Sequence, residues 1–157
     1  MKPTLYLETT VVSYLVARPS DNLVVAAHQQ VTHQWWNKRL PDFQVVVSQF
    51  VLDEAAGGDA QAARERLNAI QEFPILDLTE EVGDLAAALL TALALPAKAA
   101  TDAAHIALAA VHEMHFLLTW NCTHIANAEM AVVIENVCRE RGFSCPVICT
   151  PEELMGI

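Results

Sequence analysis

Short apolar runs alternate along the chain with longer segments of helical spacing, and this order predicts a βαβ arrangement. The runs predicted to form strands cover residues 4–7, 44–48, 74–78, 116–119 and 147–149. Continuous apolar runs between helices are typical of strands buried on both faces of a parallel sheet. The pattern therefore predicts an α/β fold, a three-layer α/β/α sandwich with a central, mostly parallel five-stranded sheet.

Apolar spacing and capping residues predict the helices between these strands. Helices are expected at residues 10–17, from 21 through 35, around 51–52, and at 60–71, 80–93, 100–113 and 127–141. Asp21, Thr79 and Asn127 are the expected N-caps, because their side-chain oxygens can accept the free N–H groups of a first turn. Gly142 is expected just beyond the last helix. The second helix is expected to bury one face, formed by Val24, Ala27, Val31 and Trp35.

Composition narrows the class of protein. Of the 157 residues 54% are hydrophobic, so we expect one domain, residues 1–157, with a large core. The formal net charge of -10 excludes a generic nucleic-acid coat protein, which needs a basic surface. The most apolar stretch, residues 85–97, contains Thr91 and Pro96 and is too short for a membrane span. The apolar run after Lys2 soon meets Glu8, so we expect no signal peptide and a cytoplasmic protein.

The four cysteines all lie in the last quarter of the chain, at positions 122, 138, 145 and 149. A zinc site can be drawn from the pair Cys145 and Cys149 or from Cys122 with His124. No Cys-x-x-Cys pair supports it, and residues 146–148 have the character of a strand. Free thiols in a reducing cytoplasm are the favoured interpretation.

Four polar residues lie next to the predicted strands: Glu8, Glu54, Asp102 and Asn121. The carboxyl ends of parallel strands meet along one edge of a sheet, so these side chains are expected to face one crevice. Three carboxylates placed together raise one another's pKa unless a cation neutralises them. Oxygen ligands of this kind suit Mg²⁺ or Mn²⁺, and the pattern favours a divalent-cation site.

The same segments carry a family resemblance. They are YLETTVVSYL at residues 6–15, SQFVLDE at 48–54 with Glu54 in the helix after the second strand, DAAHIA at 102–107 and LLTWN at 117–121. In order, spacing and size they resemble the PIN-domain family of metal-dependent nucleases, in particular the small VapC-type toxins of toxin–antitoxin pairs. The resemblance covers nearly the whole chain and implies a PIN-like sandwich.

The resemblance implies hydrolysis of phosphodiester bonds, most often in RNA. A cation held by Glu8, Asp102 and Glu54 would lower the pKa of a bound water and orient it on the phosphorus. Thr119 and Asn121 would position water or phosphate. Further candidate substrate contacts are Thr9, His105, His124 and Lys98. The family also implies a small antitoxin protein as a partner, and a homodimer.

Two positions depart from the family pattern. Glu8 stands where the family usually has Asp, and Asn121 stands where it usually has a fourth carboxylate. A neutral amide holds a second cation less well, so the resemblance supports one metal site. The same amide motivates an alternative function, a catalytically weakened PIN-fold module that binds RNA or protein. A phosphoacceptor signalling domain is set aside, because it needs adjacent acids after the first strand.

Several candidates also have plain structural interpretations. His105 could be a helix-surface histidine, and His124 could stabilise a loop through a hydrogen bond. Trp120 could stack on a base or pack between a strand and a helix. Trp35 and Trp36 indicate a core or a dimer face.

Overall fold

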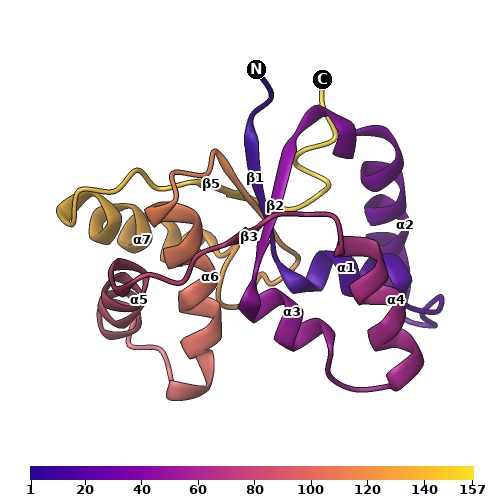
Figure 1. The fold of residues 1–157 in the computed structure, drawn as a ribbon, viewed down its shortest axis with the longest axis horizontal. Coiled ribbons are helices and arrows are strands. Elements are labelled where there is room, and N and C mark those ends of the chain that lie inside the picture. Colours follow the sequence, from indigo (N-terminus) through magenta and orange to yellow (C-terminus); the bar gives the residue numbers. More distant parts are fainter.

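The computed structural model describes residues 1–157 and contains a central sheet of five strands (Figure 1). The strands are β1 (Thr4–Leu7), β2 (Gln44–Ser48), β3 (Ile75–Leu76), β4 (Phe116–Leu118) and β5 (Val147–Cys149). Their spatial order is β3-β2-β1-β4-β5, and every neighbouring pair is parallel. The predicted five-stranded parallel sheet is confirmed, with a third strand of two residues, shorter than the predicted 74–78.

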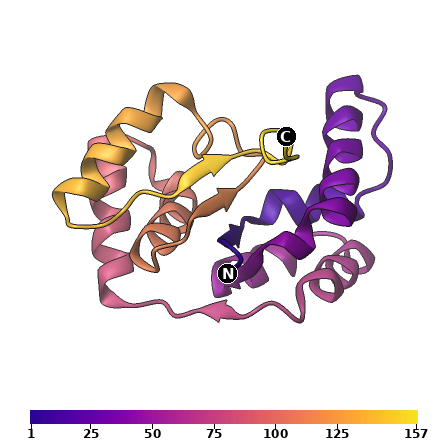
Figure 2. The same ribbon diagram turned by 90° about the horizontal axis from the view of Figure 1, so that it is seen from above.

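Seven α-helices pack around this sheet. They are α1 (Thr9–Val16), α2 (Leu23–Lys38), α3 (Gln49–Ala55), α4 (Ala60–Ile70), α5 (Glu80–Ala92), α6 (Ala100–Val111) and α7 (Ala128–Glu140). Helices α1, α2 and α4 lie on one side of the sheet, and α5, α6 and α7 lie on the other (Figures 1 and 2). The three-layer α/β/α sandwich is therefore also confirmed. No helix of the structure has the length and apolar character needed to cross a membrane.

The core forms around β1 and α6, which explains their continuous apolar sequences. Leu5, Tyr6 and Leu7 of the central strand are fully buried, and so is the whole run 103–110 of α6 apart from a small exposed part of Ala104. The small alanine side chains of α6 let the neighbouring helix α5 approach closely. Trp35 is fully buried in this core, which confirms the core interpretation of that residue.

The second helix differs from the prediction in its N-cap. Asn22 caps α2, and not Asp21, because the side-chain oxygen of Asn22 accepts from the backbone N–H groups of Val24 and Val25. The predicted caps Thr79 and Asn127 are confirmed. Gly142 follows the last helix with a φ of 82°, the left-handed conformation that glycine adopts without strain.

The predicted buried face of α2 is correct toward its end, where Trp35 is buried and Val31 is half-buried against the core, and wrong at its start. Val24 is 64% exposed and Ala27 is exposed, whereas Gln29 and Thr32 are buried beside Trp35. The reason lies in hydrogen bonds from other segments. The Gln29 amide donates to the carbonyl of residue 18 and accepts from the N–H of residue 20, and the Thr32 hydroxyl accepts from Nε1 of Trp120. Polar side chains with such partners can be buried at small cost.

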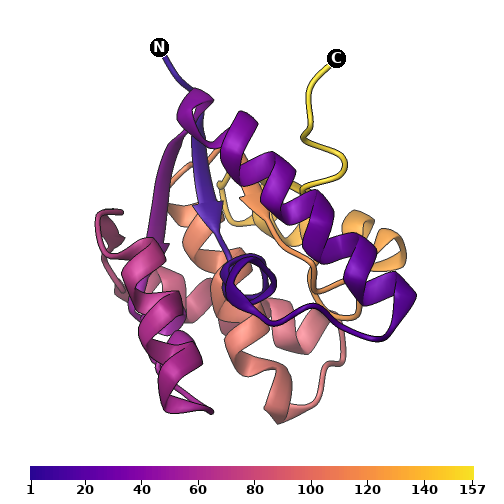
Figure 3. The same ribbon diagram turned by 90° about the vertical axis from the view of Figure 1, so that its right-hand side faces the viewer.

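A switch point of the sheet lies between β1 and β4. The chain leaves β1 toward β2 through α1 and α2, and it leaves β4 toward β5 through α7 on the opposite face. Figure 3 shows β1 running away from both chain ends toward α1. Open parallel sheets bind ligands beyond the carboxyl ends of the strands at such a point.

Candidate metal centre

Glu8 lies at the switch point, directly after β1 and at the N-cap of α1. Its backbone N–H donates to the carbonyl of Leu118 at 3.0 Å, which continues the pairing of β1 with β4. The side chain does not cap the helix; instead its Oε1 accepts from the hydroxyls of Thr10 and Thr119, the latter at 2.6 Å. Only 2% of Glu8 is exposed. The two hydroxyls therefore replace the water that would otherwise solvate this carboxyl.

The loop after β4 fixes both of these hydroxyls. The backbone N–H of Trp120 donates to Oγ1 of Thr10 at 2.8 Å, and the backbone N–H of Asn121 donates to Oγ1 of Thr119 at 2.9 Å. Each hydroxyl therefore accepts from the backbone and donates to Glu8. The loop sequence thereby sets the orientation of the carboxyl.

Glu54 reaches the same place from the end of α3. Its Oε1 accepts from the hydroxyl of Thr9 and from Nε2 of His105, each at 2.7 Å. The Glu54 side chain is 38% exposed, whereas that of His105 is fully buried. The interpretation of His105 as a helix-surface residue is therefore wrong, and Thr9 holds Glu54 as a hydrogen-bond donor.

A buried chain of hydrogen bonds continues behind His105. Its Nδ1 lies 2.6 Å from the hydroxyl oxygen of Tyr6, and that oxygen lies 2.7 Å from Oγ of Ser48. Tyr6 and Ser48 belong to the two central strands β1 and β2. We call the Ser48, Tyr6 and His105 side chains the buried relay.

Glu8, Glu54 and His105 together could hold a metal ion. One ligand atom from each lies within 4.8 Å of the other two. In both glutamates the side-chain hydrogen bonds fall on Oε1, and no side chain donates to Oε2. Two carboxylates and an imidazole this close together fit a hard or borderline divalent cation such as Mg²⁺ or Mn²⁺. No cysteine belongs to this group.

The pKa values of Glu8 and Glu54 are shifted in opposite directions. Burial raises the pKa of Glu8 above its ordinary value, and the opposing effects of His105, Thr10 and Thr119 do not cancel it. Burial also acts to raise the pKa of Glu54, but the hydrogen bonds from His105 and Thr9 outweigh it and hold that pKa below its ordinary value. Charging Glu8 without a cation is therefore costly, whereas Glu54 is readily ionised.

Asp102 belongs to a neighbouring hydrogen-bonded group. Its Oδ1 accepts from Nδ2 of Asn121 at 3.1 Å, and its Oδ2 lies 3.0 Å from Nδ1 of His124. Oδ1 of Asn121 accepts from the backbone N–H groups of Thr123 and His124, which closes the loop after β4. The predicted role of Asp102 as a metal ligand stays a prediction, because the structure pairs it with Asn121 and His124 and not with the two glutamates.

Of the remaining candidates, Lys98 lies on the surface and Trp120 is packed in the interior. Lys98 is exposed and forms no ion pair. Trp120 is 8% exposed, its ring stacks on His28 at 4.1 Å between centroids, and its Nε1 donates to the hydroxyl of Thr32. The packing interpretation of Trp120 is thus confirmed.

The sequence pattern missed three residues of the site: Thr10, Ser48 and Tyr6. A tyrosine inside an apolar strand was an available signal, since a buried phenolic hydroxyl needs a hydrogen-bond partner. No comparable signal identifies Thr10 or Ser48, because hydroxyl residues at helix starts are common as caps.

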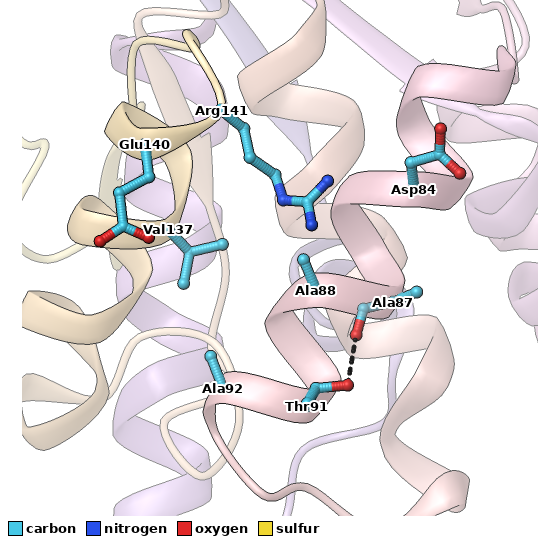
Figure 4. Close-up of a pocket in the computed structure, with 8 residues that line it drawn as sticks. All are labelled: Asp84, Ala87, Ala88, Thr91, Ala92, Val137, Glu140 and Arg141. Carbon is cyan, nitrogen blue, oxygen red and sulfur yellow. Dashed lines mark hydrogen bonds between the residues drawn. The ribbon is translucent and has the colours of Figure 1, made fainter.

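A separate hollow of about 530 Å³ lies between α5 and the end of α7 (Figure 4). Alanines of α5 form part of its wall, with Asp84, Glu140 and Arg141 at its margins. None of the candidate site residues lines it.

No protein-family model, no curated protein and no solved structure matches this chain. The likeness to PIN-domain nucleases therefore stays a prediction from the residues.

Proposed function

We propose that this chain is a Mg²⁺- or Mn²⁺-dependent endoribonuclease of the PIN-domain kind, acting in the cytoplasm as the toxin of a type II toxin–antitoxin pair. The observation that carries the proposal is the meeting of Glu8 and Glu54 at the switch point, each with one oxygen to which no side chain donates. The sequence resemblance supplies the expected chemistry, hydrolysis of phosphodiester bonds in RNA.

Each residue of the candidate site would have a separate role in this reaction. A bound cation lowers the pKa of a water and offsets charge on the phosphate oxygens. Glu8 and Glu54 are the residues that would hold it, with Asp102 as the third acid of the resemblance. The hydroxyls of Thr9 and Thr119 keep one oxygen of each glutamate occupied, which leaves the other for the site.

The negative net charge is consistent with a specific RNA substrate and not with general binding of nucleic acids. A chain of net charge -10 repels long nucleic acids over most of its surface. Contact through a cation with one phosphate of a specific RNA avoids this repulsion. A basic segment of an antitoxin lying over the acids would be attracted by the same charge, and we include a homodimer in the proposal.

A second candidate function is a PIN-fold module that binds RNA or protein without cleaving it. The observation that favours it is the pairing of both Asp102 oxygens, one with Asn121 and one with His124. An acid engaged in this way is less available to a cation.

A cleavage assay with matched variants tests the proposal. Purified wild-type chain, Glu54→Gln and Asp102→Ala are incubated with a panel of short RNAs and Mn²⁺, with and without EDTA. Asp53→Asn is the matched control, because Asp53 neighbours Glu54 but is exposed and bonded only to Gln49. We expect EDTA-sensitive cleavage by the wild type and Asp53→Asn alone.

Other outcomes separate the alternatives. Equal cleavage by all four proteins indicates a contaminating nuclease. RNA binding without cleavage supports the second candidate. No cleavage of any RNA, together with no Mn²⁺ binding in calorimetry, overturns the enzyme.

A further inference from the structure

We propose that His105 is a positioning residue of the metal centre: backed by Tyr6 and Ser48, it fixes the Glu54 carboxylate so that Oε2 of Glu54 stays available to the cation. The inference rests on the proposed function, since it concerns the same centre. It assigns a role to three side chains that the cleavage chemistry itself does not use.

The hydrogen-bond roles follow from the partners. An ionised carboxylate only accepts, so the 2.7 Å contact between Glu54 and His105 requires the hydrogen on Nε2. In a neutral ring Nδ1 is then an acceptor, and the Tyr6 hydroxyl at 2.6 Å donates to it. Burial raises the pKa of Tyr6, which keeps that hydroxyl protonated. The hydroxyl of Ser48, at 2.7 Å, then donates to Tyr6. In a charged ring Nδ1 donates to Tyr6 instead, and Nε2 donates to Glu54 in either state.

Burial makes the relay rigid. Tyr6 and His105 are fully buried and Ser48 is 1% exposed, so no water competes for their hydrogen bonds. The Tyr6 ring lies against the His105 ring at 5.7 Å between centroids, and Phe50 packs edge-on against it at 6.4 Å. The imidazole therefore has no room to rotate, and the position of its Nε2 is set by the core.

The relay also holds the helix that carries Glu54. Oγ of Ser48 accepts from the N–H of Val51 and so caps the start of α3, while His105 contacts Glu54 near the end of the same helix. Both ends of α3 are thereby tied to β1, β2 and α6. Removing a partner that orients a metal ligand in this way typically weakens metal binding by about 10- to 100-fold.

Direct ligation by His105 is the competing role. Its Nε2 is among the three ligand atoms that lie close together, but this nitrogen already donates to Glu54 and the side chain is fully buried. The two roles differ in one measurable respect. A positioning residue acts only through Glu54, whereas a ligand contributes on its own.

Calorimetric titration with Mn²⁺ tests the positioning role without any RNA. We expect His105→Leu to weaken Mn²⁺ binding by about 10- to 100-fold. His105→Gln keeps an N–H near the Nε2 position and should restore most of that loss, and Tyr6→Phe should cause a smaller loss. His33→Leu and Tyr14→Phe are matched controls with unchanged affinity, since neither side chain has a hydrogen-bond partner in the protein and His33 is exposed.

A double-variant cycle separates positioning from ligation. In a Glu54→Gln background, His105→Leu should cause no further loss of Mn²⁺ affinity if His105 acts through Glu54. A further loss of similar size assigns His105 as a ligand and overturns the positioning role.

The remaining outcomes are decisive as well. Wild-type affinity in His105→Leu overturns the inference and leaves the proposed function standing. No Mn²⁺ binding by the wild-type chain overturns both. Thermal melting monitors folding of each variant, and where His105→Leu does not fold, Tyr6→Phe decides: an unchanged affinity in that variant overturns the relay.

Discussion

The side-chain amide of Asn121 donates to Oδ1 of Asp102 at 3.1 Å, which joins the fourth-strand loop to the start of α6. The backbone N–H of Asn121 donates to Thr119, whose hydroxyl donates to Glu8. The pair is therefore linked to the candidate metal centre through one threonine. The neutral amide stabilises the Asp102 carboxylate through this hydrogen bond.

Asn121→Asp should destabilise the cation-free protein. Two carboxylates would face each other where a hydrogen bond now lies, at a cost of about 1–3 kcal/mol. Mn²⁺ should remove this loss, so we expect a lowered Tm in EDTA and a larger rise on adding Mn²⁺ than in the wild type. Asn37→Asp, at an exposed position of α2, is the matched control. An equal drop with and without Mn²⁺ would place Asn121 outside the reach of the cation.

Raising the pH should destabilise the cation-free protein through Glu8. The folded-state pKa of Glu8 lies above its ordinary value of 4.5, chiefly because burial penalises the charged form. Its contribution to stability is therefore complete below that ordinary value and is lost as the pH rises through the raised pKa. Glu8→Gln should lack this loss and should be more stable than the wild type near neutral pH in EDTA. Chemical unfolding measured from about pH 5 to about pH 8 checks it.

Glu54→Gln should change the stability in the opposite direction from Glu8→Gln. Although burial acts to raise it, the pKa of Glu54 is held below 4.5 by His105 and Thr9, so its contribution is present above that value and is lost as the pH falls through the lowered pKa. We expect this variant to be less stable than the wild type near neutral pH, in the same unfolding series. A gain in stability for both glutamine variants would contradict the assigned hydrogen bonds of Glu54.

Thr32→Val should destabilise the fold by about 1–3 kcal/mol, because Nε1 of Trp120 would lose its acceptor in a buried position. Thr91→Val is a matched control: its hydroxyl also donates to a carbonyl four residues earlier in its helix, but at an exposed site. Urea unfolding of both variants measures the difference. Equal losses would mean that the Trp120 bond contributes nothing.

Cys122 should react first with a thiol reagent such as Ellman's reagent. It is the exposed cysteine, whereas Cys138 and Cys149 are buried, and burial raises the pKa of Cys149 to about 12. The reagent does not reach a buried sulfur, so Cys138 and Cys149 should react only after unfolding. Cys122→Ser should abolish the fast phase. A fast phase that persists in this variant would show that another thiol is accessible.

The strands could be predicted because a parallel sheet covered on both faces needs continuous apolar runs, and the chain has five of them. The buried face of α2 could be predicted only in part. Gln29 and Thr32 are buried because their partners come from other segments, and helical spacing contains no information about those segments. Apolar pattern thus predicts elements well and predicts helix orientation poorly where polar side chains are satisfied.

For the candidate site, the meeting of Glu8 and Glu54 could be predicted from the residues alone, because the carboxyl ends of parallel strands share one edge. Their hydrogen-bond partners could not be predicted in this way. His105 joins Glu54 across 51 positions of the chain and Tyr6 across 99, while Asp102 turns to Asn121. A hydrogen bond requires its two atoms to lie about 3 Å apart, and that distance depends on how whole helices pack. The spacing of residues along the chain therefore does not predict these bonds.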